Sequence, residues 1–185
     1  LATPLQIANS YATLAEHGLI GITWPVAYGG QGRSKLDQIV LAEEFAKARV
    51  PVGRVTDVTT VKMLGNTLVR WGTEEQKRQY LPRIISGEDV WVQGYSEPEA
   101  GSDLAGLRVS ARRDGDHFVL NGQKIWTSRG MEGTHIFVLA RTNPHAAKHR
   151  GISFLLCQAD TPGVEVRPIR TSTGEEEFCE IFFTD

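Results

Sequence analysis

Two short segments of this chain carry residue types that can hold a cofactor with a phosphate group and a flat ring. Residues 94–106 place glycines and hydroxylated side chains around a turn, so that backbone N–H groups and the Ser102 hydroxyl can approach a diphosphate. In residues 121–128 the Trp126 indole stands beside Thr127 and Ser128, which suits stacking on a heterocycle and hydrogen bonding to its edge. Together the segments predict a cofactor site.

Each segment also has an ordinary structural interpretation. Residues 96–99 fit the S-x-x-E capping box, and residues 102–103 fit the start of another capped turn. Asn121-Gly122 is a strong signal for a tight hairpin, and a Trp shortly after such a turn usually belongs to the core. The order of the segments favours the cofactor interpretation, because helix capping does not require a hairpin with Trp-Thr-Ser to follow a glycine loop.

Composition narrows the class of protein. The chain has 185 residues, of which 41% are apolar and 23% charged, as in a globular protein with a buried core. Its net charge of −2 makes nucleic acid and anionic membranes poor partners. Cys157 and Cys179 form neither a disulfide framework nor a metal-ligand spacing, so we expect a cytoplasmic protein without a metal site. We find no signal peptide and no apolar segment of membrane-spanning length.

The residues up to about Val90 show helical periodicity. Ser34 and Thr73 are predicted N-caps, and we expect Pro82 to divide the last helical segment in two. The predicted helical segments are residues 4–17, 34–46, 57–70 and 73–87.

After Val90 the hydrophobic period falls to two, as in β-strands. Turns are predicted at Asp114-Gly115 and Asn121-Gly122. The predicted strands are residues 109–113, 117–120, 123–127, 135–141, 152–156 and 180–183. The sequence therefore predicts an α+β chain, with a helical domain over residues 1–90 and an antiparallel β-barrel or sandwich over residues 91–185.

Further motifs surround the two segments. Residues 18–32 form a glycine-rich turn between helices, residues 72–82 lead towards the β region, and residues 148–153 enter a strand. In this order, and with the glycine loop and the Trp-Thr-Ser segment, they resemble the acyl-CoA dehydrogenase family over nearly the whole chain. The resemblance implies an N-terminal helical domain, a middle β-domain with the flavin-binding loop, and a C-terminal helical domain that this chain lacks.

The resemblance also implies roles for individual residues. Residues 93–102 are expected along the flavin, with the backbone near Tyr95 and Ser96 at the isoalloxazine edge. Trp126 is expected to cover one flavin face. The implied cofactor-binding residues are Gln93, Gly94, Tyr95, Ser96, Gly101, Ser102, Trp126, Thr127 and Ser128.

Ser102 is expected near both the diphosphate and the bound thioester, and Thr127 and Ser128 near flavin N5 and O4. Tyr95 departs from the family, where a smaller aliphatic residue is common at this position. Its ring is expected to reshape the acyl pocket while the backbone contact with flavin remains.

The implied reaction is α,β-dehydrogenation of an acyl-CoA with a fatty acyl or sterol side chain, as in fatty acid β-oxidation. A carboxylate removes the α-proton while a hydride leaves the β-carbon for FAD. The family's base is a Glu in the C-terminal domain, beyond Asp185, so we assign no catalytic residue. Electron-transfer flavoprotein is the implied acceptor, and the full-length protein is implied to be a homo- or hetero-oligomer.

Two other functions stay open at this point. The chain is also consistent with a non-catalytic subunit or fragment that binds flavin or thioester, and with an acyl-CoA oxidase that passes electrons to oxygen. We expect the 185-residue fragment alone to bind FAD weakly or not at all, and to be inactive.

Overall fold

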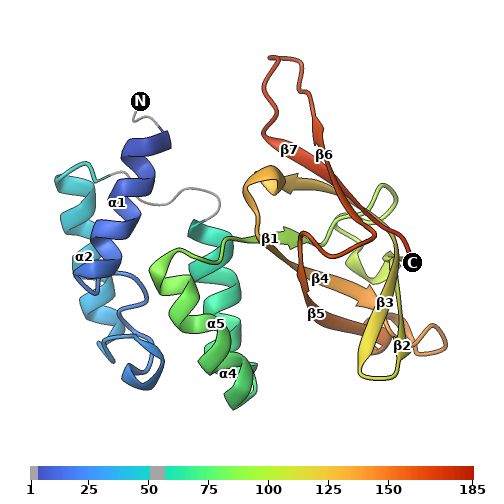
Figure 1. Cartoon of the computed structure of the whole chain (residues 1–185), viewed down its shortest axis with the longest axis horizontal. Helices are drawn as coiled ribbons and strands as arrows, with labels where there is room; N and C mark the ends of the chain where they lie inside the picture. Colours follow the sequence, from blue (N-terminus) through green and yellow to red (C-terminus); the bar gives the residue numbers. More distant parts are fainter. Residues whose placement is uncertain (1–3, 51–56) are drawn as a thin grey trace. The chain divides into compact units, whose positions relative to one another are not determined.

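The computed structural model of the chain describes residues 4–50 and 57–185. They form two units, one within Leu1–Val90 and the other within Trp91–Asp185 (Figure 1). The first unit is helical and the second is a β-sheet with short helical turns, so the predicted α+β class is confirmed. Within the described part of the chain, no helix is long and apolar enough to cross a membrane.

The helical unit begins each of its two capped helices where the sequence predicts. Ser34 and Asp37 form a reciprocal capping box, in which the Ser34 Oγ accepts from the Asp37 N–H at 3.2 Å. Thr73 and Gln76 form a second one, with 3.2 Å between the Gln76 nitrogen and the Thr73 Oγ1. The helices of this unit are α1 (Pro4–Glu16), η1 (Val26–Tyr28), α2 (Lys35–Lys47), η2 (Val58–Gly65), α4 (Asn66–Trp71) and α5 (Glu74–Ser86).

One helical prediction is wrong. Helix α5 continues through Pro82, whereas the sequence predicts two short helices; buried Leu81 and Ile84 on either side hold the segment in place despite the missing hydrogen bond. The predicted helix over residues 57–70 is confirmed, but its first part is the π-helix η2, in which backbone hydrogen bonds join residues five apart, and α4 follows it.

Trp24 forms the centre of the packing in the helical unit. Its side chain is 2% exposed, and its Nε1 donates to the Asn66 Oδ1 at 3.0 Å. Two glycines leave room for it: a Cβ at Gly65 would lie 2.2 Å from the indole, and one at Gly30 would lie 2.1 Å from the Trp24 carbonyl oxygen. The indole thus fixes η2 against the turn that precedes α2.

The described residues of the β unit form one seven-stranded mixed sheet. Strand β4 is its hub: it pairs in parallel with β1, antiparallel with β5, and at the single position Ser110–Arg141 with β2. In Figure 1 the β6–β7 hairpin extends beyond the rest of the sheet. The strands are β1 (Trp91–Gly94), β2 (Ser110–Asp114), β3 (His117–Ser128), β4 (His135–Arg141), β5 (Ile152–Gln158), β6 (Val164–Ile169) and β7 (Phe178–Phe183).

The sheet differs from the sequence prediction at three strands. Strands β1 and β6 are not predicted, and β1 makes the sheet mixed rather than wholly antiparallel. The predicted turn at Asn121-Gly122 is wrong, because β3 runs unbroken through it. Gly122 has φ 133°, and a Cβ there would lie 2.9 Å from a Val109 methyl group, so this glycine permits close approach instead of a turn.

The packing around Trp24 gives a testable prediction. We expect Gly65→Ala to lower the free energy of unfolding by about 1–3 kcal/mol, because the overpacking against a buried indole outweighs the higher helix propensity of alanine. Urea unfolding of the chain measures the change. Gly106→Ala is the control, since its Cβ would have no neighbour nearer than 3.5 Å; an equal loss in both variants would contradict the prediction.

Candidate cofactor site

Strand β3 brings the two predicted segments together. The Thr127 Oγ1 donates to the Gln93 carbonyl oxygen at 3.1 Å, and the Ile125 N–H donates to the Ser96 carbonyl oxygen at 2.9 Å. Residues 93–96 therefore lie against residues 125–127, although the chain between them forms a loop and strand β2. Thr127 is buried, with 2% exposure, and its hydroxyl proton is used by Gln93. What Thr127 offers a ligand is thus a lone pair or its backbone.

Trp126 lies on the surface in an unusual backbone conformation. Its exposed fraction is 58%, so the interpretation of this residue as core is wrong. The pairing of β3 with β7 shifts register between Lys124 and Thr127, and within this bulge Trp126 has φ 61°. A left-handed conformation costs a bulky residue about 1–3 kcal/mol and persists only where its surroundings enforce it. The indole and the Phe178 ring stand nearly perpendicular, with ring centroids 6.0 Å apart, and most of the indole remains exposed.

The glycine loop begins with a tight turn. Glu97 and Ala100 exchange backbone hydrogen bonds of 2.8 and 3.1 Å, and exposed Gly101 and Ser102 follow. No helix begins at Ser96, so the capping-box interpretation of residues 96–99 is wrong.

Ser102 does not cap the helical turn that follows it. The short helix η3 (Leu104–Gly106) has Asp103 at its N-cap position and no side-chain cap. A Cβ at Gly101 would have no heavy atom of the described chain within 4 Å. The space over Gly101 and Ser102 is therefore open to a ligand.

A buried ion pair supports the site and was missed by the sequence analysis. Lys124 is fully buried, and its Nζ lies 2.8 Å from Glu97 Oε1 and 3.0 Å from the Tyr95 carbonyl oxygen. Burial lowers the pKa of the Lys124 ammonium, and the hydrogen bond and charge of Glu97 offset part of that effect. The Glu97 carboxylate also accepts the backbone N–H groups of Arg108 and Val109, at 2.6 and 2.9 Å.

Arg141 fixes the far end of the glycine loop and was likewise not predicted. Its Nη2 and Nε donate to the carbonyl oxygens of Ala105 and Leu107, at 2.8 and 3.2 Å. Its Nη1 donates to the Lys148 carbonyl oxygen at 3.0 Å, which ties in the short helix η5 (Lys148–Gly151). The loop that carries Ser102 is thus anchored by a cation at each end.

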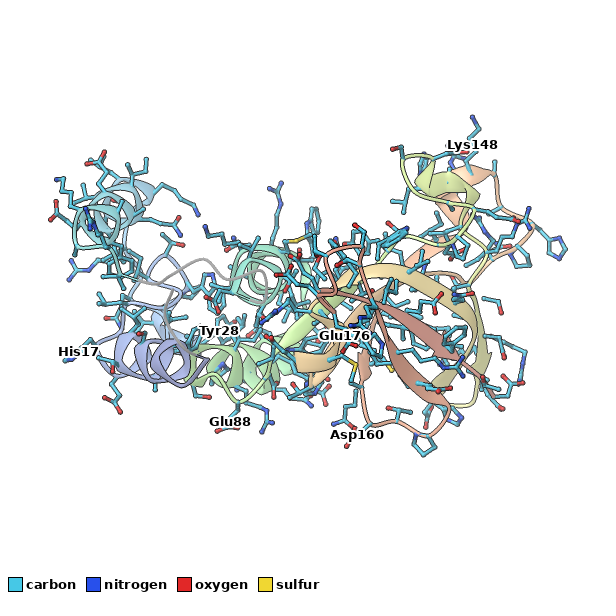
Figure 2. The ribbon with its side chains drawn as sticks, turned by 90° about the horizontal axis from the view of Figure 1, so that it is seen from above. His17, Tyr28, Glu88, Lys148, Asp160 and Glu176 are labelled. Atoms are coloured by element: carbon cyan, nitrogen blue, oxygen red, sulfur yellow. The ribbon has the colours of Figure 1, made fainter. Side chains whose placement is uncertain are left out.

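Two of the carboxylates near the loop, those of Glu97 and Glu99, are already engaged. Glu97 is held by Lys124, and Glu99 pairs with Arg108 at 2.8 Å on the surface. The acidic run 175–177 belongs to the β6–β7 connection and lies beside the end of β3, where the Arg129 N–H donates to the Glu177 carbonyl oxygen at 2.7 Å. In Figure 2, Glu176 lies well apart from Lys148, which borders the far end of the glycine loop. In the part of the chain that the structure describes, no group of three His, Cys, Asp or Glu residues can hold a metal ion.

The helical unit has a separate cavity of about 450 Å³. It is mainly apolar and lies among α1, α2, η2 and the turn before α2, with Leu14, Ile22, Leu41, Phe45 and Val61 in its lining. None of the predicted cofactor-binding residues lines this cavity.

Comparison with known proteins assigns the family. Residues 93–185 match the acyl-CoA dehydrogenase middle domain, and residues 4–88 match the acyl-CoA dehydrogenase N-terminal domain. The chain belongs to the acyl-CoA dehydrogenase family. Both units, and not the β unit alone, carry the family's sequence pattern.

Individual relatives show how much of the family's length is present. Acyl-CoA dehydrogenase IpdE1 of Mycobacterium tuberculosis is 46% identical over 172 residues, which are 93% of this chain and 44% of the relative. A solved structure named Tcur3481-Tcur3483 steroid ACAD superposes with a TM-score of 0.84 at 41% identity, covering 97% of this chain and 45% of that one. A glutaryl-CoA dehydrogenase of Mycobacterium smegmatis in complex with FADH2 gives a TM-score of 0.75 at 28% identity, over 96% and 45%. The chain spans less than half the length of these relatives.

The geometry of Trp126 gives a second prediction. In the full-length protein, we expect Trp126→Gly to weaken FAD binding by about 1–3 kcal/mol, the value of one stacked aromatic ring. Because the indole is exposed and glycine relieves the left-handed backbone, the free energy of unfolding of the apoprotein should fall by less than about 1 kcal/mol. Trp126→Ala keeps the strained Cβ and should be the less stable variant. Normal FAD affinity in either folded variant would refute a stacking role.

Proposed function

We propose that this chain is part of an FAD-dependent acyl-CoA dehydrogenase that oxidises a CoA thioester between its α and β carbons. The observation that carries the proposal is the pairing of residues 93–96 with the segment around Trp126 in a chain of this family. This pairing places an exposed indole near a glycine loop with open space over Gly101.

The residues present fit FAD. Trp126 offers an exposed ring that the backbone holds in a strained conformation, as is common where a side chain serves a ligand. Residues 93–96, Thr127 and Ser128 would border the ring system. Gly101 and Ser102 would contact the diphosphate, and Ser102 also the thioester.

FAD, when bound, accepts the hydride that leaves the β-carbon. The described residues bind and orient: Trp126 covers a ring face, the loop after Gly101 approaches phosphate, and the anchored backbone keeps both in place. The carboxylates of Glu97 and Glu99 are engaged by Lys124 and Arg108. We assign no general base among residues 1–185, and membership of the family favours a Glu elsewhere in the full-length protein.

The relatives support a proposal for the substrate and partners. A steroid acyl-CoA dehydrogenase among the similar structures favours a sterol side-chain or fatty acyl thioester. That structure carries two protein names, which favours an oligomer with a second copy or a related chain. Electron-transfer flavoprotein is the proposed acceptor and the cytoplasm the proposed compartment. Acyl-CoA oxidase activity, or flavin and thioester binding without turnover, are the alternatives.

Two protein lengths test the proposal. The full-length protein should carry flavin absorbance and oxidise an acyl-CoA with an artificial electron acceptor, whereas the 185-residue fragment should bind FAD weakly and show no turnover. Stoichiometric FAD in the fragment, or turnover by it, would show that the site is complete within this chain. Flavin binding without turnover in the full-length protein would favour the binding-only alternative, and oxygen consumption at comparable rates would favour an oxidase.

Ser102 offers a more local test. Because the structure shows no cap at this residue, we expect Ser102→Gly in the full-length protein to leave stability almost unchanged. Binding of FAD or acyl-CoA should weaken by about 0.5–1.5 kcal/mol, or about 3 if the partner oxygen is charged. Calorimetric titration with each ligand measures the loss. Unchanged affinity for both ligands would remove Ser102 from the site.

A further inference from the structure

The buried pair of Lys124 and Glu97 lies beneath the proposed flavin-binding segment. Lys124 is fully buried and Glu97 is 9% exposed, with 2.8 Å between Nζ and Oε1. The Lys124 ammonium also donates to the Tyr95 carbonyl oxygen, and the Glu97 carboxylate accepts hydrogen bonds from the backbone N–H groups of Arg108 and Val109. The pair thus joins β3 to the chain after β1 and to the chain before β2.

Stability is a weak reason for such a pair. Removing two charges from water is costly, and apolar residues in place of a buried ion pair often leave stability equal or higher. Specific placement of a neighbouring group is a better-supported use of a buried polar network. The question is which neighbour the pair places.

The neighbour is the bulge that carries Trp126. Lys124 precedes the register shift of β3 and Thr127 follows it. Each bonds a backbone carbonyl oxygen of the same facing segment: Lys124 that of Tyr95, and Thr127 that of Gln93. The left-handed backbone of Trp126 lies between these two anchors. Such a conformation needs fixed flanks, because a relaxed strand would return the residue to the extended region.

We propose that Lys124, held by Glu97, is a positioning residue that fixes the Trp126 indole for stacking on the cofactor. The inference rests on the proposed FAD site. Lys124 does not touch the cofactor; it acts through the Tyr95 carbonyl and the bulge. Loss of the ammonium leaves that carbonyl without its donor and frees one flank of the bulge, so the indole samples orientations that do not stack. Affinity falls because the site is no longer organised before binding.

The first experiment measures FAD affinity of the full-length apoprotein with Lys124→Met. The flavin dissociation constant should rise at least about tenfold, the scale of one hydrogen bond to a charged group. Val166→Ala is the matched control. It shortens a β6 side chain that packs against the hydrophobic core of the sheet, and β7 lies between β6 and β3. It should lower stability to urea while FAD affinity stays within about twofold, because it removes no hydrogen bond between β3 and residues 93–96.

A double-mutant cycle separates positioning from general loosening. If Lys124 acts through Trp126, then Lys124→Met introduced into a Trp126→Gly protein should change the FAD dissociation constant by less than about threefold, because the indole it places is gone. Equal effects in both backgrounds would overturn the proposal. A purely structural role predicts equal effects.

The double variant Lys124→Met with Glu97→Gln tests the same loss of the ammonium without leaving a buried carboxylate charge that could prevent folding. It leaves no unpaired buried charge and retains an amide oxygen that can accept from Arg108 or Val109. It should fold and show the same rise in the FAD dissociation constant.

Besides equal effects in the double-mutant cycle, three further results would contradict the inference or the proposed function on which it rests. Wild-type affinity in both Lys124 variants overturns it, as does failure of both to fold while Val166→Ala folds. A wild-type full-length protein that binds no FAD instead refutes the proposed function, before any variant is compared.

Discussion

The candidate site depends on hydrogen bonds from β3 to the backbone at the end of β1 and just beyond it. The carbonyl oxygens of Gln93, Tyr95 and Ser96 are each held by a β3 donor. The ladder between β1 and β4 ends at Gly94, so beyond that point the sheet alone does not determine the path of the chain. The β3 donors supply that constraint, and the open glycine loop begins where they end.

Local signals in the sequence predict the helices better than the sheet. The capping boxes at Ser34 and Thr73 are visible because each needs only residues three positions apart. Continuity of α5 through Pro82 and of β3 through Gly122 is set by contacts from elsewhere in each unit, which outweigh the local turn and breaker signals. In strand β1 the apolar residues Trp91 and Val92 are adjacent and both buried, so an alternating pattern does not reveal it.

In the candidate site, too, the residues identified by local motifs are predicted and those that depend on distant partners are not. Trp126 and Ser102 are predicted because their residue types and motif context are contained in short segments. The supporting pair of Lys124 and Glu97 is not predicted, because its partners come from separate segments and a lysine in a polar stretch is expected on the surface. The exposure of Trp126 also required the structure, since the register shift that turns it outward arises from pairing with β7.

The parallel pairing of β1 with β4 affects the order in which the β unit assembles. Hairpins such as β2–β3 and β6–β7 join neighbouring segments and close quickly, whereas β1 must find a strand across a long stretch of chain. We therefore expect β1 to dock late in folding. Because the carbonyl oxygens that β3 holds lie at the end of β1 and just beyond it, a chain emerging from the ribosome would form its candidate cofactor site only after most of its sheet.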